Sequence, residues 1–329
     1  MIISRTPFRA SLFGGGTDLS DYYENSRFGY GAVISTAINM YTYMTVNKKF
    51  DNRIRVGYSK TEIVDCVDEI EHNIIREALK IVGIDSGIDI VYMADIPLDS
   101  AGIGLASSSA LAVGILNALY AYTGKHVSAE RLAKEACQIE IEILKNPIGK
   151  QDQYAVAYGG LQKYQFNADG SVFVDPIICK QETKKHLQDN LMLFYTGLTR
   201  KSSTVLTEQK EKIPQKMKRL DRLVEMVNIA ESALQNNNLD DIGRLLHEAW
   251  MIKRQFASNV SNDLIDEMYN RAISAGALGG KILGAGGGGF LMMYVPDDKK
   301  EKVRRALGDY KCCDIGFEPQ GSKIIYVSE

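Results

Sequence analysis

Three glycine-rich segments, each next to an apolar run, constrain this chain more than any other feature of its sequence. They are PFRASLFGGGTDL at residues 7–19, GIGLASSSALAVG at 102–114 and GAGGGGF at 284–290. Glycine loses more conformational entropy on folding than any other residue, so runs of glycine indicate close backbone approach or unusual φ angles. A structural turn or hairpin would explain any one segment. Three together favour a fold that brings the backbone close to a ligand.

The middle segment predicts a phosphate-binding loop at the start of a buried helix. The first N–H groups of a helix have no partner within it and lie at the positive end of its dipole, so they attract anions. Small residues would let a phosphate reach this backbone, and hydroxyls could bind phosphate oxygens or Mg2+. The small residues are Gly102, Gly104 and Ala106, and the hydroxyls are those of Ser107, Ser108 and Ser109. The Walker A pattern is missing and GxGxxG is met only loosely, which argues against a P-loop or a dinucleotide-binding fold.

The length of the chain predicts two domains, and its balance of charges favours a small ligand over nucleic acid or a membrane. At 329 residues the chain exceeds one ordinary domain, and a shift from strand-rich to helix-rich sequence predicts domains at 1–185 and 186–329. With 39 basic and 41 acidic residues the chain has no overall positive field that would attract nucleic acid or an anionic membrane. An anionic ligand must therefore be bound by local groups.

Cysteine and histidine patterns and the N-terminal sequence predict the cellular setting. The five cysteines form an odd set without CxxC spacing, which favours a reducing cytoplasm. The chain starts without a long apolar segment and has no run of about 18 apolar residues, so neither secretion nor membrane insertion is expected. The four histidines are scattered and lack HExxH spacing, so no zinc site is expected.

Hydrophobic periodicity predicts the secondary structure around these segments. Alternating residues at 30–60 indicate antiparallel strands, Asp169-Gly170 indicates a hairpin, and LMLFYTG at 191–197 indicates a buried strand. The apolar run after the serines predicts a helix closed by Gly124, and the next helix is expected to begin at Ser128 and end before Pro147. Apolar residues at helical spacing between 220 and 250 predict two further helices.

The order PxRxxxxGGGTD, then GLxSSSA, then GAGGGGF resembles the motifs of the GHMP small-molecule kinases. PFRASLFGGGTDLSDYY and PIGKQDQYAVAYGGL are most similar to bacterial kinases of the D-glycero-D-manno-heptose 7-phosphate kinase type. The resemblance covers most of the chain, from Pro7 to about Tyr294. It implies an α+β fold of two domains, the first like domain 2 of ribosomal protein S5 and the second ferredoxin-like. It also implies that ATP and the acceptor bind in the cleft between them.

The resemblance implies roles for individual residues. Ser108 and Glu140 correspond to the ligands of Mg2+, with Glu142 as the alternative carboxylate. Asp152 corresponds to the catalytic aspartate, which would orient the acceptor hydroxyl and accept its proton. Arg9 corresponds to the basic residue beside the transferred phosphate, where it would stabilise that group and keep Asp152 ionised.

The first and third segments are implied to serve the acceptor. The residues expected to bind substrate are Gly15, Gly16, Thr17, Asp18, Gly286 and Gly287. Asp18 corresponds to an acidic position that holds sugar hydroxyls, and residues 284–289 should brace the phosphate loop. One residue departs from the pattern, because Ala106 stands where the family usually has glycine. If that position requires positive φ, the alanine costs about 1 kcal/mol or more.

The acceptor is less well defined by the sequence. The resemblance favours the anomeric hydroxyl of a heptose 7-phosphate, giving a 1,7-bisphosphate for nucleotide-activated heptose synthesis towards lipopolysaccharide or capsule. Another sugar 1-kinase, acting on fucose or a related hexose, is the alternative. A non-catalytic sensor that binds ATP and sugar is a third reading, against which the retained catalytic and magnesium residues argue.

A sugar phosphate would need further cations, for which the candidates are Arg27, Lys150, Arg200 and Lys281. The anomer and the oligomeric state, including a homodimer, stay open.

Overall fold

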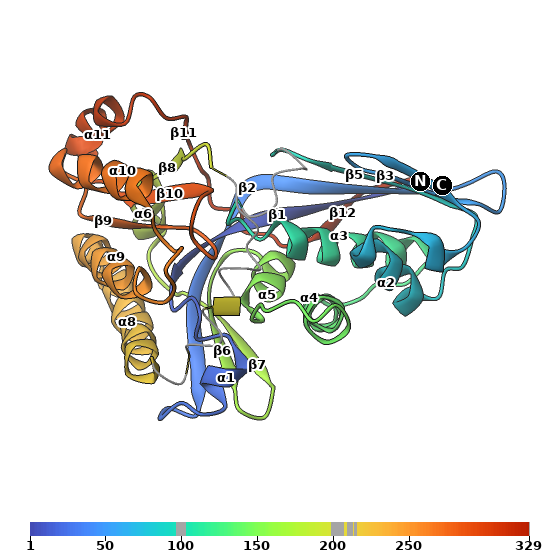
Figure 1. The fold of residues 1–329 in the computed structure, drawn as a ribbon, viewed down its shortest axis with the longest axis horizontal. Helices are drawn as coiled ribbons and strands as arrows, with labels where there is room; N and C mark the ends of the chain where they lie inside the picture. The colour runs from blue at the N-terminus through green and yellow to red at the C-terminus, as the bar shows by residue number, and fades with distance from the viewer. Residues whose placement is uncertain (97–102, 199–206, 209–212, 214–215, 329) are drawn as a thin grey trace.

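Two β-sheets with helices packed against them make up the protein in the computed structural model, which describes residues 1–96, 103–198, 207–208, 213 and 216–328 (Figure 1). Within these residues the first sheet has eight strands in the order β12-β1-β2-β5-β3-β4, with β6 beside β2 and β7 beside β6. The second has the order β11-β8-β10-β9. The strands of the first sheet are β1 (Ile2–Phe13), β2 (Tyr30–Lys48), β3 (Ile54–Gly57), β4 (Thr61–Val64), β5 (Ile88–Ala94), β6 (Leu161–Asn167), β7 (Val172–Pro176) and β12 (Lys323–Val327). Those of the second are β8 (Leu191–Tyr195), β9 (Gly279–Ile282), β10 (Phe290–Tyr294) and β11 (Cys312–Cys313).

In sequence, most of the described helices connect one strand to the next. They are α1 (Ser20–Tyr23), α2 (Asn73–Val82), α3 (Ser107–Tyr122), α4 (Ala129–Cys137), α5 (Gln151–Tyr158), α6 (Gln181–Asn190), α8 (Met217–Gln235), α9 (Leu239–Lys253), α10 (Asp263–Ser274) and α11 (Lys300–Ala306). Short 3-10 turns occupy Val67–Glu69 and Asp297–Lys299. No helix within the described ranges combines the length and the apolar sequence that a membrane span requires.

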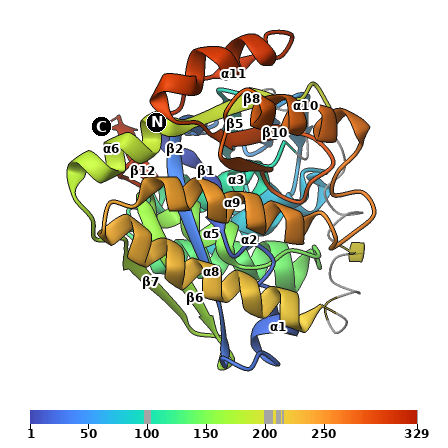
Figure 2. The same cartoon turned by 90° about the vertical axis from the view of Figure 1, so that its left-hand side faces the viewer.

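The long strands β1 and β2 form the centre of the first sheet. Residues at the start of β1 alternate between buried and partly buried, but every residue from Thr6 to Phe13 is buried. Alternation indicates a sheet covered on one face, whereas continuous burial indicates cover on both faces. Helices α3 and α5 contact both strands, and α8 contacts them as well. In Figures 1 and 2, α8 and α9 lie across these strands from α5. Arg9 and Ser11 therefore belong to the half of the sheet that is covered on both faces.

The secondary structure predicted from periodicity is largely confirmed. The hairpin at Asp169-Gly170 joins β6 to β7, and the buried strand at 191–197 is β8. The predicted helices between 220 and 250 are α8 and α9. The third glycine-rich segment is the loop of the β9–β10 hairpin, which the N–H of Leu283 closes by donating to the carbonyl of Phe290 at 2.9 Å.

The helix expected from Ser128 to before Pro147 changes type along its length. It begins as predicted, with the Ser128 hydroxyl accepting a hydrogen bond from the N–H of Arg131 at 3.2 Å. The α-helix ends at Cys137, however, and Gln138–Ile143 form a π-helical turn. A π turn contains more residues than an α turn and frequently marks a functional site. Here it contains the buried side chain of Glu140.

The chain returns to the first sheet at its C-terminus. The boundary predicted near residue 185 falls within α6, after which β8 enters the second sheet. β12 then pairs with Ile2–Arg5 of β1, which places the two termini side by side (Figure 1). The predicted range 186–329 therefore includes β12, which is a strand of the first sheet. This strand covers an edge of β1 that would otherwise be open.

Candidate active site

The three glycine-rich segments meet at a cavity of about 210 Å³. Its lining comes from the first segment (Arg9, Ser11, Gly15, Gly16, Asp18, Leu19), the second (Gly104, Ala106, Ser107, Ser108), the start of α5 and the residues before it (Ile148, Gly149, Gln151, Asp152) and the second half of the chain (Lys253, Phe256, Lys281, Gly284, Ala285). Gly102 lies outside the described residues.

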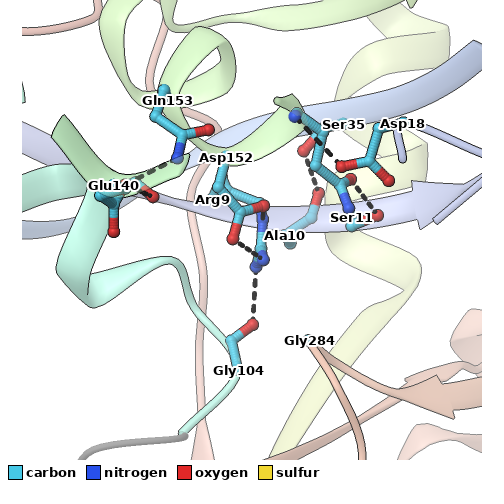
Figure 3. Close-up of polar contacts among 12 residues, drawn as sticks. Arg9, Ala10, Ser11, Asp18, Ser35, Gly104, Glu140, Asp152, Gln153 and Gly284 are labelled. Carbon is cyan, nitrogen blue, oxygen red and sulfur yellow. Dashed lines mark hydrogen bonds and ion pairs between the residues drawn. The ribbon is translucent and has the colours of Figure 1, made fainter. Parts of the chain in front are cut away.

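Arg9 and Asp152, 143 residues apart in sequence, form a bidentate ion pair. Nε and Nη2 of Arg9 each donate to a carboxylate oxygen of Asp152 at 2.8 Å. Nη1 of Arg9 donates to the carbonyl of Gly104 at 2.6 Å, so one guanidinium joins β1, α5 and the serine-rich loop (Figure 3). Arg9 is 2% exposed, whereas the carboxylate of Asp152 is partly open to the cavity. Two parallel charge-assisted bonds fix the position of this carboxylate.

The serine-rich loop turns into α3 through a left-handed residue. Ala106 has φ +65° and ψ +38°, so this position requires the positive φ that the family pattern suggested. Ser107 and Ser108 line the cavity in the first turn of α3, while Ser109 is buried. Ala106 makes no side-chain cap to the helix, which leaves the N-terminus of α3 available to an anion in the cavity.

Glu140 lies behind this first turn. Its Oε2 accepts hydrogen bonds from the Ser109 hydroxyl and from the side-chain amide of Gln153, both at 2.7 Å (Figure 3). Its Oε1 is buried and has no hydrogen-bond partner among the described residues. Burial raises the pKa of Glu140, and the nearby hydroxyls of Ser109 and Ser108 oppose that rise. Glu142 is exposed.

Asp18 occupies the other side of the Arg9–Asp152 pair (Figure 3). Its carboxylate accepts hydrogen bonds from the N–H of Gly16 at 3.0 Å and of Gln151 at 3.2 Å. Burial, and then the charge of Asp152, raise the pKa of Asp18 to about 6. Two carboxylates therefore share one cavity in different electrostatic surroundings.

The third glycine-rich segment packs directly on the second. A Cβ on Gly104 would lie 2.3 Å from the carbonyl oxygen of Leu283, and one on Gly284 would lie 2.5 Å from the Cα of Gly104. A Cβ on Gly289 would lie 2.2 Å from the carbonyl oxygen of Ile103. These contacts explain the glycines as positions of close backbone approach, and they brace the serine-rich loop.

Three of the residues expected to bind substrate have internal partners instead. The Thr17 hydroxyl lies 2.8 Å from the carbonyl oxygens of both Gly14 and Ala32, which share its single donor proton, and the residue is fully buried. The N–H of Gly287 donates to the carbonyl of Val260 at 2.9 Å, and Gly286 packs against the same residue. Thr17, Gly286 and Gly287 are not among the described residues that line the cavity.

The cationic residues suggested by the sequence as ligands of a substrate phosphate have different locations in the structure. Lys281 lines the cavity, whereas Arg27 pairs with Asp221 and Glu225, and Lys150 donates to the carbonyl of Gly170. Arg200 lies outside the described residues.

Sequence reasoning did not single out Lys253, Gln151 or Gln153. Gln151 and Gln153 flank Asp152 in KQDQ, which is a local signal, but Lys253 ends a helix with no motif around it.

Comparisons with known proteins show the family to which the chain belongs. The family model described as GHMP kinases N terminal domain matches residues 70–160, and the one described as GHMP kinases C terminal matches residues 230–311. The chain belongs to the GHMP kinases. It is an ATP-dependent kinase with the two-domain α+β fold of that family.

Individual relatives of this GHMP kinase include several sugar kinases. The D-glycero-alpha-D-manno-heptose 7-phosphate kinase of Campylobacter jejuni is 28% identical, over 98% of both chains. A bifunctional fucokinase/GDP-fucose pyrophosphorylase of Arabidopsis thaliana is 25% identical over 94% of this chain and 31% of its own length. In fold, the kinase resembles a D-glycero-D-manno-heptose 1-phosphate kinase from Bacteroides thetaiotaomicron, with a TM-score of 0.82, 24% identity and full coverage of both chains.

Proposed function

We propose that this GHMP kinase transfers the γ-phosphate of ATP to the anomeric hydroxyl of D-glycero-D-manno-heptose 7-phosphate, giving the 1,7-bisphosphate. The observation that carries the proposal is the similarity to the Campylobacter jejuni heptose 7-phosphate kinase over 98% of both chains. The cavity supports it, because a carboxylate fixed by Arg9 lies between a serine-rich helix N-terminus and the second carboxylate, Asp18.

The residues of the cavity divide the work of phosphoryl transfer. Such a reaction requires mainly positioning and charge neutralisation. Ser107, Ser108 and the N-terminus of α3 would hold phosphate oxygens on one side of the Arg9–Asp152 pair. Asp18 would accept hydrogen bonds from sugar hydroxyls on the other side. Asp152 would then orient the acceptor hydroxyl and take its proton, while Arg9 holds Asp152 in place.

Magnesium fits the same arrangement. Among the described residues no three His, Cys, Asp or Glu side chains gather into a metal site, so the ion would be bound jointly with ATP. The donors are Ser108, which faces the cavity, and Glu140, whose buried Oε1 lacks a partner among the described residues. Oxygen ligands of this kind suit Mg2+. When bound, the ion would neutralise charge on the phosphates. The side chains of Ser109 and Gln153 fix the position of the Glu140 carboxylate that would bind it.

A panel of acceptors tests the proposal. ADP release would be measured with ATP and Mg2+ and with D-glycero-D-manno-heptose 7-phosphate, mannose 6-phosphate, mannose, fucose and galactose. We expect the heptose 7-phosphate to give the highest kcat/KM and the free hexoses to be poor substrates. Faster turnover of fucose would favour the alternative that the fucokinase relative suggests. ATP and sugar binding without transfer to any acceptor would indicate a sensor.

A further inference from the structure

Two lysines from the second half of the chain line the cavity, and backbone carbonyls hold both. Lys281 of β9 is 4% exposed, and its ammonium donates to the carbonyl of Leu12 at 3.1 Å. Lys253, the last residue of α9, donates to the carbonyl of Ile282 at 3.2 Å and to that of Gly284. Neither lysine forms an ion pair with a carboxylate in the part of the chain that the structure describes. Two cations thus face the cavity without a direct ion pair, although the carboxylates of Asp152 and Asp18 act on Lys253 at longer range.

This arrangement is electrostatically incomplete. A buried ammonium without a negative partner is unfavourable, because carbonyl dipoles replace only part of its hydration. Burial, and then the charge of Arg9, lower the pKa of Lys253 to about 7. Burial and the charge of Lys253 lower the pKa of Lys281 well below its usual value. A dianion bound in the cavity near both ammonium groups would offset both penalties.

The position of the lysines indicates which anion this is. The serine-rich loop and α3 already offer donors to the phosphates of ATP, and the Arg9 guanidinium is bound to Asp152. Lys281 donates to the carbonyl of Leu12, which belongs to the first glycine-rich segment, the segment that also carries Asp18. Apart from Arg9, Lys253 and Lys281 are the cations among the described residues of the lining.

We propose that Lys253 and Lys281 together bind the phosphate group that the acceptor sugar already carries, and so select sugar phosphates over free sugars. The inference rests on the proposed function, since it requires a phosphorylated acceptor. It assigns a role to Lys253, which carries no motif, and retains Lys281 from the cations suggested by the sequence.

The test compares binding of a sugar with and without its phosphate. Mannose 6-phosphate, mannose and D-glycero-D-manno-heptose 7-phosphate would be titrated calorimetrically into protein saturated with a non-hydrolysable ATP analogue. The variants are Lys253→Met and Lys281→Met, which keep an unbranched apolar side chain and remove the charge. Lys150→Met is the matched control, because that ammonium donates to Gly170 in the β6–β7 hairpin.

We expect the wild-type protein to prefer the phosphorylated sugars and each cavity variant to lose at least about tenfold of that preference, as expected for a charged hydrogen bond. Affinity for the ATP analogue and for mannose should change little, and Lys150→Met should keep the preference. Thermal midpoints of the cavity variants should stay level or rise, because removing a buried unpaired charge does not weaken packing.

Three results would overturn the inference, and they differ in what they say about the proposed function. If the wild-type protein prefers the phosphorylated sugars and the cavity variants keep this preference, the two lysines do not bind the acceptor phosphate. The proposed function would then still stand. Loss of affinity for the ATP analogue in both cavity variants, at unchanged acceptor affinity, would place the lysines at the phosphates of the nucleotide instead. Wild-type protein without any preference for the phosphorylated sugar would contradict the proposed function itself.

Discussion

Replacing Asp152 by asparagine removes one negative charge from the cavity and almost no volume. The carboxylate accepts two hydrogen bonds from Arg9 at 2.8 Å, and asparagine has one oxygen with which to accept one of them. Its amide group would face the second N–H of Arg9, donor against donor. The variant therefore loses both a proton acceptor and one charge-assisted contact to an arginine that is 2% exposed.

The size of each effect follows from this geometry. A positioned general base contributes about 10²- to 10⁴-fold in rate, so single-turnover phosphoryl transfer should slow by that range. A hydrogen bond to a charged group is worth about 1.5–3 kcal/mol, and because Asp152 is partly open to solvent we expect a loss of unfolding free energy near the lower figure. Affinity for ATP should change little, since Ser107, Ser108 and the N-terminus of α3 are unaltered.

Rapid-quench measurement of one turnover, with nucleotide binding measured separately, tests the prediction. Asp175→Asn is the control, because it makes the same chemical change at an exposed residue of β7. If Asp152 only stabilised the N-terminus of α5, asparagine would cost less than about 1 kcal/mol and transfer would be nearly normal. That result would refute the catalytic role. Loss of ATP binding would refute it differently, by showing that Asp152 maintains the nucleotide side of the cavity.

Three further predictions concern other residues of the site. Glu140→Gln should raise the Mg2+ concentration required for half-maximal activity and lower turnover, whereas Glu142→Gln should leave both unchanged because Glu142 is exposed; equal losses would contradict the magnesium assignment. Ala106→Gly should raise the unfolding free energy by up to about 1 kcal/mol in denaturant titrations, since it relieves a non-glycine residue at φ +65°, and a loss of stability would refute the strain. Because burial and Asp152 raise the pKa of Asp18 to about 6, the acceptor kcat/KM should fall as pH drops below about 6 and Asp18 gains a proton. Asp18→Asn should abolish that limb of the pH profile, and a limb that survives would have to come from another group.

Several parts of the site follow from local sequence. Glycine and alanine before three serines, followed by an apolar run, specified the start of α3 and its serines. The comparison with the family pattern also identified Ala106 as a departure from the usual glycine, and the structure shows a left-handed conformation there. Local signals of this kind work because φ restrictions, capping and helix dipoles act within a few residues of the chain.

Other parts depend on contacts that no local pattern encodes. The sequence predicted catalytic roles for Arg9 and Asp152, but only the packing of β1 against α5 placed the two side chains 2.8 Å apart. From local sequence a lysine is expected at the surface. Lys253 and Lys281 nevertheless line the cavity, because the ends of α9 and β9 lie beside it. Thr17 is the opposite case. The sequence predicted that it binds substrate, but its hydroxyl is hydrogen-bonded to backbone carbonyls of the protein. The return of β12 to the first sheet likewise has no local signal, because strand pairing depends on an edge that other, distant parts of the chain leave open.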